Sequence, residues 1–264
     1  MIPLWNDQTP FFDPSFSQEP PYLVPYLLDD GKPHGCVIVC PGGGYSGKAK
    51  HEGEPIALIL NQAGFHAYVL QYRVSPYRHP VPFTDAQRAI RYVRFHAAEN
   101  RILPDHIGIL GFSAGGHLAV SAGTHYDEDF LPFHDEIDRV SARPDCIIPC
   151  YGVISFGKYA HRNSASRLTG KPYEELTEEE IRYHSGECNI NDNTPPCFLW
   201  HTAEDGSVPV ENSLQMALAL SEHKIPFALH VFPFGRHGIG LGKDIPLANE
   251  WPSLLCKWLK EFGY

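Results

Sequence analysis

Three residues that lie far apart in the chain could together carry out nucleophilic catalysis: Ser113, Asp205 and His237. Ser113 is the centre of Gly-Phe-Ser-Ala-Gly at 111–115, a pattern that places a serine on a sharp strand-to-helix turn with its hydroxyl exposed. A serine hydroxyl is a poor nucleophile at neutral pH. It therefore needs a histidine as base and a carboxylate that orients this histidine. These residue types predict acyl transfer through a Ser-His-Asp triad.

The acid and the base follow the serine in the chain order that this arrangement requires. Asp205 comes after an apolar segment at 196–201, and His237 lies between glycines after another at 227–232. Glu204 is an alternative to Asp205 for the orienting role. Each residue alone is compatible with a structural role, since the chain has fifteen histidines and aspartate is common in turns. Their joint occurrence, each after a predicted strand, favours catalysis.

Such a triad also needs donors for the negative charge that develops on the substrate carbonyl oxygen, and backbone amides suit this task. Gly43 and Gly44 follow an apolar segment and precede a predicted helix, and Ala114 follows the serine directly. The glycines could simply form a flexible turn. Their position between a strand and a helix favours the alternative, an oxyanion hole formed by the amides of Gly43, Gly44 and Ala114.

Short apolar runs and helical periodicity alternate along the chain and predict the elements that position these residues. Strands are expected at 36–40, 65–72, 106–112, 146–151, 196–201 and 227–232. Helices are expected at 55–63, 86–97, 114–123, 210–221 and 251–262, with a proline-containing loop at 73–82. This alternation predicts an α/β fold with a mostly parallel sheet and helices on both faces.

We expect residues 1–264 to form a single domain with two additions. Residues 1–33 are rich in proline and aromatic residues and predict an extended arm, with an edge strand at 22–28. The polar segment 152–195 interrupts the alternation and carries a capping-box pattern, Thr177 with Glu180. We expect it to be an insertion over the carboxyl edge of the sheet, where ligands bind in such folds.

The composition of the chain limits which partners the protein can bind and where in the cell it is expected. The formal net charge is −10 and there is no run of Lys or Arg, which argues against nucleic acid. No secretory signal and no membrane-spanning apolar stretch is visible, so the cytoplasm is the expected location. Cys36 with Cys40, and Cys146 with Cys150, are about 13 Å apart along a strand, too far to share a metal ion. Reduced core cysteines, and neither metal nor cofactor, are expected.

Several motifs together resemble the α/β-hydrolase esterase and lipase family, in particular small bacterial acetyl-xylan and feruloyl-type carbohydrate esterases. The resemblance covers the chain from about residue 35 onward and includes 41–45 (Pro-Gly-Gly-Gly-Tyr), 51–55 (His-Glu-Gly-Glu-Pro), 72–73, 111–116, Asp205 with 208–209, and 235–238. It favours Asp205 over Glu204, because Asp205 precedes a turn and a helix start as in that family. The segment 51–55 is expected to be structural.

The resemblance implies a serine carboxylester hydrolase that removes acetyl or other short acyl groups from sugars or xylo-oligosaccharides. Tyr45, Tyr72, Tyr151 and Trp200 could stack on sugar rings, and core packing explains them equally well. Two alternatives stay open: a peptidase or amidase similar to prolyl-oligopeptidase catalytic domains, and a non-catalytic binding protein of the same fold. The acyl group, the alcohol and the oligomeric state are not fixed by the sequence.

Overall fold

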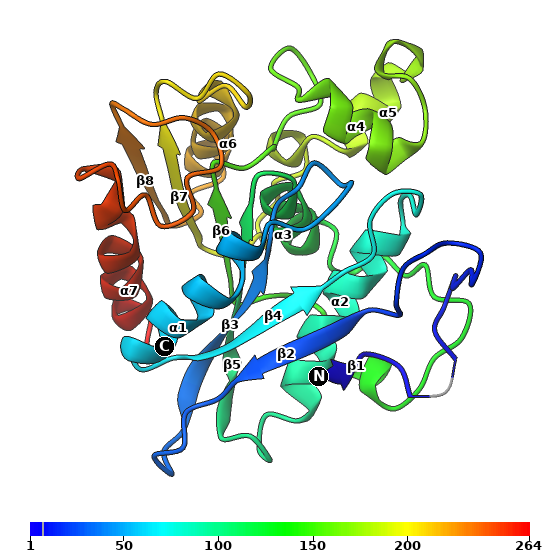
Figure 1. Cartoon of the computed structure of the whole chain (residues 1–264), viewed down its shortest axis with the longest axis vertical. Coiled ribbons are helices and arrows are strands. Elements are labelled where there is room, and N and C mark those ends of the chain that lie inside the picture. The colour runs from blue at the N-terminus through cyan, green and yellow to red at the C-terminus, as the bar shows by residue number, and fades with distance from the viewer. Residues whose placement is uncertain (7) are drawn as a thin grey trace.

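The computed structural model describes residues 1–6 and 8–264, and within them one eight-stranded sheet organises the chain (Figure 1). Its spatial order is β1-β2-β4-β3-β5-β6-β7-β8. β2 pairs antiparallel with β1 and with β4, and the other neighbours are parallel. The strands are β1 (Ile2–Pro3), β2 (Tyr22–Tyr26), β3 (His34–Cys40), β4 (His66–Gln71), β5 (Ile102–Phe112), β6 (Cys146–Cys150), β7 (Cys197–Thr202) and β8 (Phe227–Phe232). The predicted mostly parallel α/β fold is confirmed.

Both faces of the central strands are buried, which explains why β3 is almost continuously apolar. Ile38 of β3 belongs to one apolar cluster together with Leu118 of α3, whereas its neighbour Val39 belongs to the other together with Trp251 of α7. Successive side chains on a strand point to opposite faces, so the sheet separates these two clusters. The helices are α1 (Glu54–Gln62), α2 (Val81–Phe95), α3 (Ala114–Thr124), α4 (Arg162–Thr169), α5 (Glu178–Tyr183), α6 (Glu211–Glu222) and α7 (Trp251–Glu261).

Most boundaries lie within two residues of those expected, and three features differ more. α2 begins at Val81 rather than near residue 86, because Pro82 fits the first helical turn, where its missing N–H needs no partner. β5 begins at Ile102 rather than at His106, and its register against β3 shifts between His34 and Cys36. The strand predicted at 22–28 is present as β2, but it is not the edge strand, because the two-residue β1 pairs with its outer side.

Residues 152–195 form a separate layer of short elements. They carry α4 and α5, which lie beyond the carboxyl ends of the parallel strands in Figure 1. Thr177 caps α5 as expected: its Oγ1 accepts from the Glu180 amide at 3.1 Å, and the Thr177 amide donates to Glu180 Oε2 at 3.0 Å. The remaining short elements of the described chain are single 3₁₀ turns at Lys50–Glu52, Ile137–Arg139, Tyr173–Glu175, Gly186–Cys188 and Ala248–Glu250.

The cysteines expected in the core are buried and free of disulfide bonds. Cys36 and Cys40 lie on β3, and Cys146 and Cys150 on β6. Burial raises the pKa of the Cys146 thiol to about 12, so it stays protonated at neutral pH. Among the helices of the described residues, none has the length and apolar character needed to cross a membrane.

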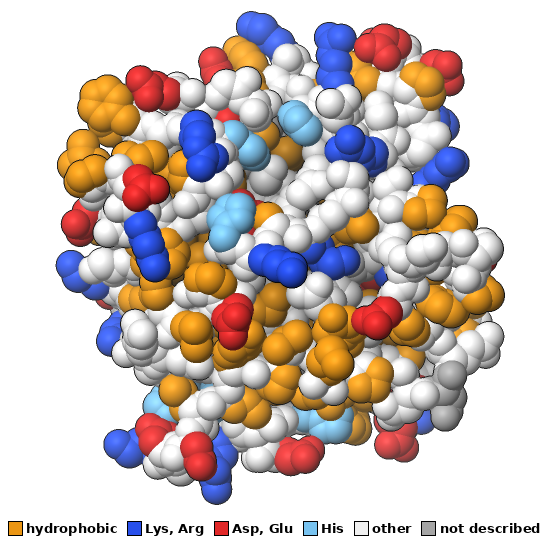
Figure 2. Space-filling model, viewed as in Figure 1, with side chains coloured by type: hydrophobic (Ala, Val, Ile, Leu, Met, Phe, Trp, Pro, Cys, Tyr) orange, Lys and Arg blue, Asp and Glu red, His pale blue; other side chains and the backbone are white. Residues whose placement is uncertain are grey.

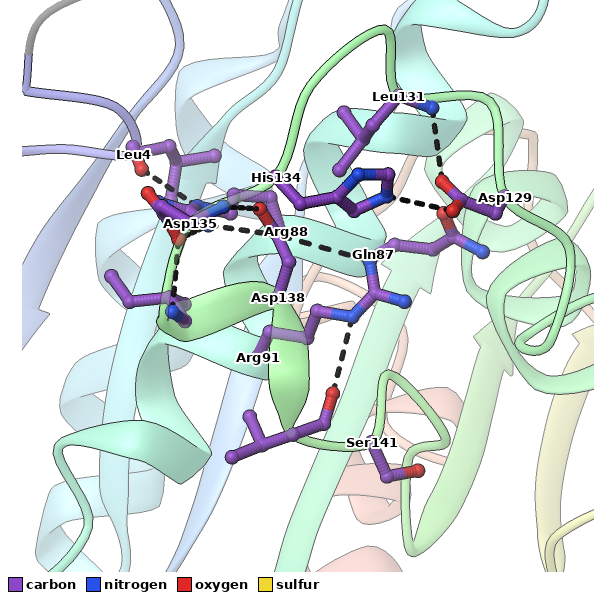
Figure 3. A network of polar contacts seen from close by, with 12 residues as sticks. Leu4, Gln87, Arg88, Arg91, Asp129, Leu131, His134, Asp135, Asp138 and Ser141 are labelled. Carbon is purple, nitrogen blue, oxygen red and sulfur yellow. Dashed lines mark hydrogen bonds and ion pairs between the residues drawn. The ribbon is translucent and has the colours of Figure 1, made fainter.

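A buried arginine fixes the N-terminal arm to α2 (Figure 3). The Arg88 side chain is 1% exposed, and its Nε donates to the carbonyl of Leu4 at 2.9 Å. Its other nitrogens form ion pairs with Asp135 at 2.5 Å and with Asp138 at 2.9 Å. Asp138 is itself buried at 2% exposure. One guanidinium therefore joins α2, the arm and the 3₁₀ turn at Ile137–Arg139.

Replacing Arg88 by Met should destabilise the protein by about 3–5 kcal/mol. The buried carboxylate of Asp138 would keep only Arg91 Nη1, 3.8 Å away, and the Leu4 carbonyl would lose its donor. Arg162→Met is the matched control: its pair with Glu174 is 67% and 70% exposed, so the loss should be about 0–1 kcal/mol. Urea unfolding measures both free energies. Equal losses in the two variants would contradict this role of Arg88.

Candidate active site

The turn at Ser113 depends on close backbone contact between α3 and the sheet. Ser113 has φ +52°, an unfavourable value for a residue with a side chain. A Cβ at Gly111 would lie 1.8 Å from the Gly115 carbonyl oxygen, and one at Gly115 would lie 2.1 Å from that of Cys40. Only glycine permits this approach at both positions. The Ser113 amide donates to the Cys150 carbonyl at 3.1 Å, which fixes the turn against the end of β6.

The three predicted catalytic side chains lie in contact. His237 Nε2 is 2.8 Å from Ser113 Oγ, and His237 Nδ1 is 2.6 Å from Asp205 Oδ2. An N–H at Nδ1 that donates to the carboxylate leaves Nε2 free to accept the serine proton. Glu204 is exposed, and its Oε2 accepts from the Gly235 amide at 3.3 Å. Asp205, not Glu204, therefore contacts the imidazole.

Several donors surround the carboxylate of Asp205. The amides of Ser207 and Val208 each donate to Oδ1 at 2.9 Å, and His201 Nε2 lies 3.4 Å from Oδ2. Burial alone would raise the pKa of Asp205. The hydrogen bonds from His201, His237 and the Val208 amide outweigh it and hold this pKa well below its usual range. Asp205 is therefore ionised at neutral pH. His201 was not predicted as part of the site, because nothing in the sequence distinguishes it from the other core positions of β7.

The predicted amide donors lie beside the serine. Gly43 and Gly44 have φ of +146° and +61°, and a Cβ at Gly43 would lie 2.2 Å from the Gly47 carbonyl oxygen. Within the described residues, no acceptor is hydrogen-bonded to the amides of Gly43, Gly44 or Ala114. Arg167 of α4 donates to the Gly44 carbonyl at 3.2 Å. Of these three residues, Gly43 and Gly44 line the cleft, whereas Ala114 is fully buried.

An open cleft joins these groups, and histidine side chains are prominent on this face of the molecule (Figure 2). Three of its lining residues come from the 152–195 segment: His161, Asn163 and Arg167. That segment therefore forms one wall of the cleft at the carboxyl edge of the sheet. The other lining residues are Gly43, Gly44, Ala49, His51, Glu52, Ser113, Ser207, His237 and Gly238.

Comparison with known proteins identifies the family, since residues 26–220 match the BD-FAE family model. The chain belongs to the BD-FAE family. It is 50% identical to an acetyl ester-xyloside bifunctional hydrolase from Caldicellulosiruptor lactoaceticus, with a TM-score of 0.94, covering 100% of this chain and 96% of that one. The predicted α/β-hydrolase esterase family is confirmed.

Two curated relatives are much longer than this chain. Endo-1,4-beta-xylanase B of Butyrivibrio fibrisolvens is 40% identical over 91% of this chain and 38% of its own length. Acetylxylan esterase of Xylanibacter ruminicola is 31% identical over 89% of this chain and 49% of its own length. The chain thus spans half or less of these relatives. One of these two relatives is named as an esterase, which is the class of enzyme that the sequence predicts.

For three tyrosines of this BD-FAE chain, the sequence left sugar stacking and core packing as alternatives. Tyr45, Tyr72 and Tyr151 are at most 1% exposed, so core packing holds and their assignment as substrate-binding residues is corrected. Each hydroxyl is instead hydrogen-bonded inside the protein: to His117 Nδ1 at 2.8 Å, to the Pro41 carbonyl at 2.6 Å and to Glu52 Oε1 at 2.6 Å, respectively. Trp200 is fully buried as well. These aromatic rings support the loops of the site.

Tyr45 also connects the glycine loop to a cluster of four histidines, His79, His117, His125 and His184. The ring centroids of His79 and His184 are 4.9 Å apart, and those of His117 and His184 are 6.3 Å apart. Burial lowers the pKa of His79 and of His117 to about 4, and that of His184 to about 2. The acidic group at the cluster is Glu128, 2.9 Å from His125 Nδ1.

These lowered pKa values predict loss of stability in acid. An unfolded histidine has a pKa near 6.5, so below that pH the unfolded chain binds protons that the folded cluster does not. Stability is full above pH 6.5 and declines as the pH falls. His184→Phe removes one such group, and the slope of unfolding free energy against pH between 6.5 and 4 should fall by up to about 1.4 kcal/mol per pH unit. Urea unfolding of the parent and of His184→Phe between pH 6.5 and 4 measures the two slopes. An unchanged slope in the variant would contradict the prediction.

Proposed function

We propose that this chain is a serine carboxylester hydrolase that removes acetyl-type acyl groups from sugars or xylo-oligosaccharides. The observation that carries the proposal is the series of contacts from Asp205 to His237 to Ser113, at 2.6 and 2.8 Å. Free amides lie beside it at Gly43, Gly44 and Ala114. Nucleophile, base, orienting carboxylate and oxyanion donors are the parts that acyl transfer needs.

In the proposed mechanism, Ser113 Oγ bonds to the acyl carbon while its proton passes to His237 Nε2. The resulting oxyanion accepts hydrogen bonds from the three amides, and ionised Asp205 stabilises the imidazolium. The bond to the alcohol then breaks, and the leaving oxygen takes the proton from His237. Water repeats these steps on the acyl-enzyme and releases the acid.

Support for the substrate comes from the relatives. Their names refer to acetylxylan esterase and to acetyl ester-xyloside hydrolysis, although the curated relatives extend well beyond this chain. We further infer that residues 1–264 act as a single domain whose 152–195 insertion contacts the alcohol side of the ester. Asn163 and Arg167 are its exposed polar side chains at the cleft.

Replacing Ser113 by Ala should reduce kcat on p-nitrophenyl acetate by about 10⁶-fold, because the attacking atom is lost. A fluorophosphonate probe should label the parent protein and not the variant. Thermal unfolding provides the control that the variant is folded. Full turnover by the folded variant would refute the proposed mechanism, and failure of the folded parent to react with the probe would favour a non-catalytic binding protein.

The roles of the two neighbouring acids can be separated. Asp205→Asn should lower kcat by about 10⁴-fold, since an amide cannot hold the imidazole in the required tautomer. Glu204→Gln, one residue earlier, should retain kcat within about threefold, because its side chain is exposed and contacts no reacting group. Steady-state kinetics on the same ester measure both, and the opposite ranking would assign the role to Glu204.

Two further activities are worth measuring alongside ester hydrolysis. An amidase would cleave a peptide anilide at a rate comparable with acetyl esters. The full-length similarity to a protein described as an acetyl ester-xyloside hydrolase specifically favours a test with p-nitrophenyl β-xyloside. If Ser113→Ala cleaves the xyloside as the parent does, that activity belongs to residues outside the triad.

A further inference from the structure

Glu52 is a buried carboxylate with no part in the proposed mechanism. It is 2% exposed, and its two oxygens bind two different parts of the site. Oε2 accepts from the Gly42 amide at 2.8 Å, and Oε1 accepts from the Tyr151 hydroxyl at 2.6 Å. Within the described residues its one possible ion-pair partner is the exposed imidazole of His51, 3.7 Å away. Hydrogen bonds, rather than a buried cation, compensate its burial.

Tyr151 extends this contact to the histidine loop. The Tyr151 oxygen accepts a hydrogen bond from the Gly240 amide at 2.9 Å, and the Tyr151 hydroxyl donates to Glu52. The donor and the acceptor of each hydrogen bond are therefore defined. The Gly240 carbonyl accepts from Trp251 Nε1 at 3.0 Å, which anchors that end to α7. The Tyr151 ring also packs against the His237 ring, with centroids 5.1 Å apart and planes at 70°.

Both ends of this hydrogen-bonded chain adjoin the reacting groups. Gly42 directly precedes the amides of Gly43 and Gly44, and a Cβ placed on it would lie 3.0 Å from Ser113 Cβ. Gly240 is three residues beyond His237. Next to Glu52, His51 Nε2 is 3.0 Å from the Gly238 carbonyl, a second link between the same two loops.

We propose that Glu52 and Tyr151 are positioning residues that hold the oxyanion amides and the catalytic base at a fixed separation around Ser113. This inference rests on the proposed function. Acyl transfer needs both groups placed to within a fraction of an ångström, and backbone loops alone do not provide this. A glutamine at position 52 offers one acceptor oxygen, so either the Gly42 amide or the Tyr151 hydroxyl would lose its partner.

Glu52→Gln and Tyr151→Phe should each lower kcat on p-nitrophenyl acetate by about 10- to 100-fold, with KM within about threefold. Affinity for phenylboronic acid, which forms a tetrahedral adduct with the serine, should fall by a similar factor. The double variant should lose no more than the worse single variant, because the two residues act through one chain of hydrogen bonds.

Tyr77→Phe is the matched control. Tyr77 is 4% exposed, and its hydroxyl accepts from the Asp13 amide at 3.0 Å and donates to the Asp13 carbonyl at 3.3 Å, in the N-terminal arm. It should lose thermal stability as Tyr151→Phe does and keep the parent kcat and boronate affinity. If Tyr151→Phe keeps the parent kcat and boronate affinity as this control does, the positioning role is refuted. If Glu52→Gln fails to fold, Tyr151→Phe alone tests the proposal. Turnover by Ser113→Ala would instead refute the proposed function.

Discussion

The site depends on how closely the first turn of α3 approaches the ends of β3 and β5. At Gly111 and Gly115 the backbones are so close that a single Cβ would overlap a carbonyl oxygen. This contact holds Ser113 at positive φ and places its side chain beside the glycine loop that follows β3. The other groups of the site are arranged around a serine whose position the sheet itself determines.

Burial of polar groups is the second constraint, and the protein satisfies it by linking loops to one another. Asp205 is kept ionised by donors from its own loop, from β7 and from the histidine loop. Glu52 accepts from the glycine loop and from Tyr151. A buried acceptor left without a donor costs about 1–3 kcal/mol. Moving one loop alone would therefore break hydrogen bonds to the neighbouring loops and lower the stability by about that amount. The hydrogen bonds that satisfy these buried groups therefore also hold the loops in position relative to one another.

The sequence predicts what depends on local pattern and misses what depends on tertiary partners. Strand and helix order follow from apolar periodicity, and Ser113, Asp205 and His237 follow from a motif and its chain order. The three tyrosines were ambiguous because an aromatic residue near the end of a strand suits a cleft and a core equally. Glu52 lies in the 51–55 motif, which was expected to be structural. Its burial and its contacts could not be predicted, because charged residues are usually exposed and its partners lie 10 and 99 residues away.

These constraints divide the site into a set of interlinked loops and an exposed wall. The glycine loop, Glu52 and Tyr151 are hydrogen-bonded to one another, as are Asp205 and His237, and these groups adjoin the ends of the strands. The 152–195 segment contributes Asn163 and Arg167 from an exposed face of α4, and a single hydrogen bond joins Arg167 to the Gly44 carbonyl. On the proposed function, this wall contacts the alcohol side of the ester, so changes in it would alter which alcohol fits while the groups around the acyl carbon stay in place. The proposal therefore assigns the chemistry and the choice of alcohol to different parts of the fold.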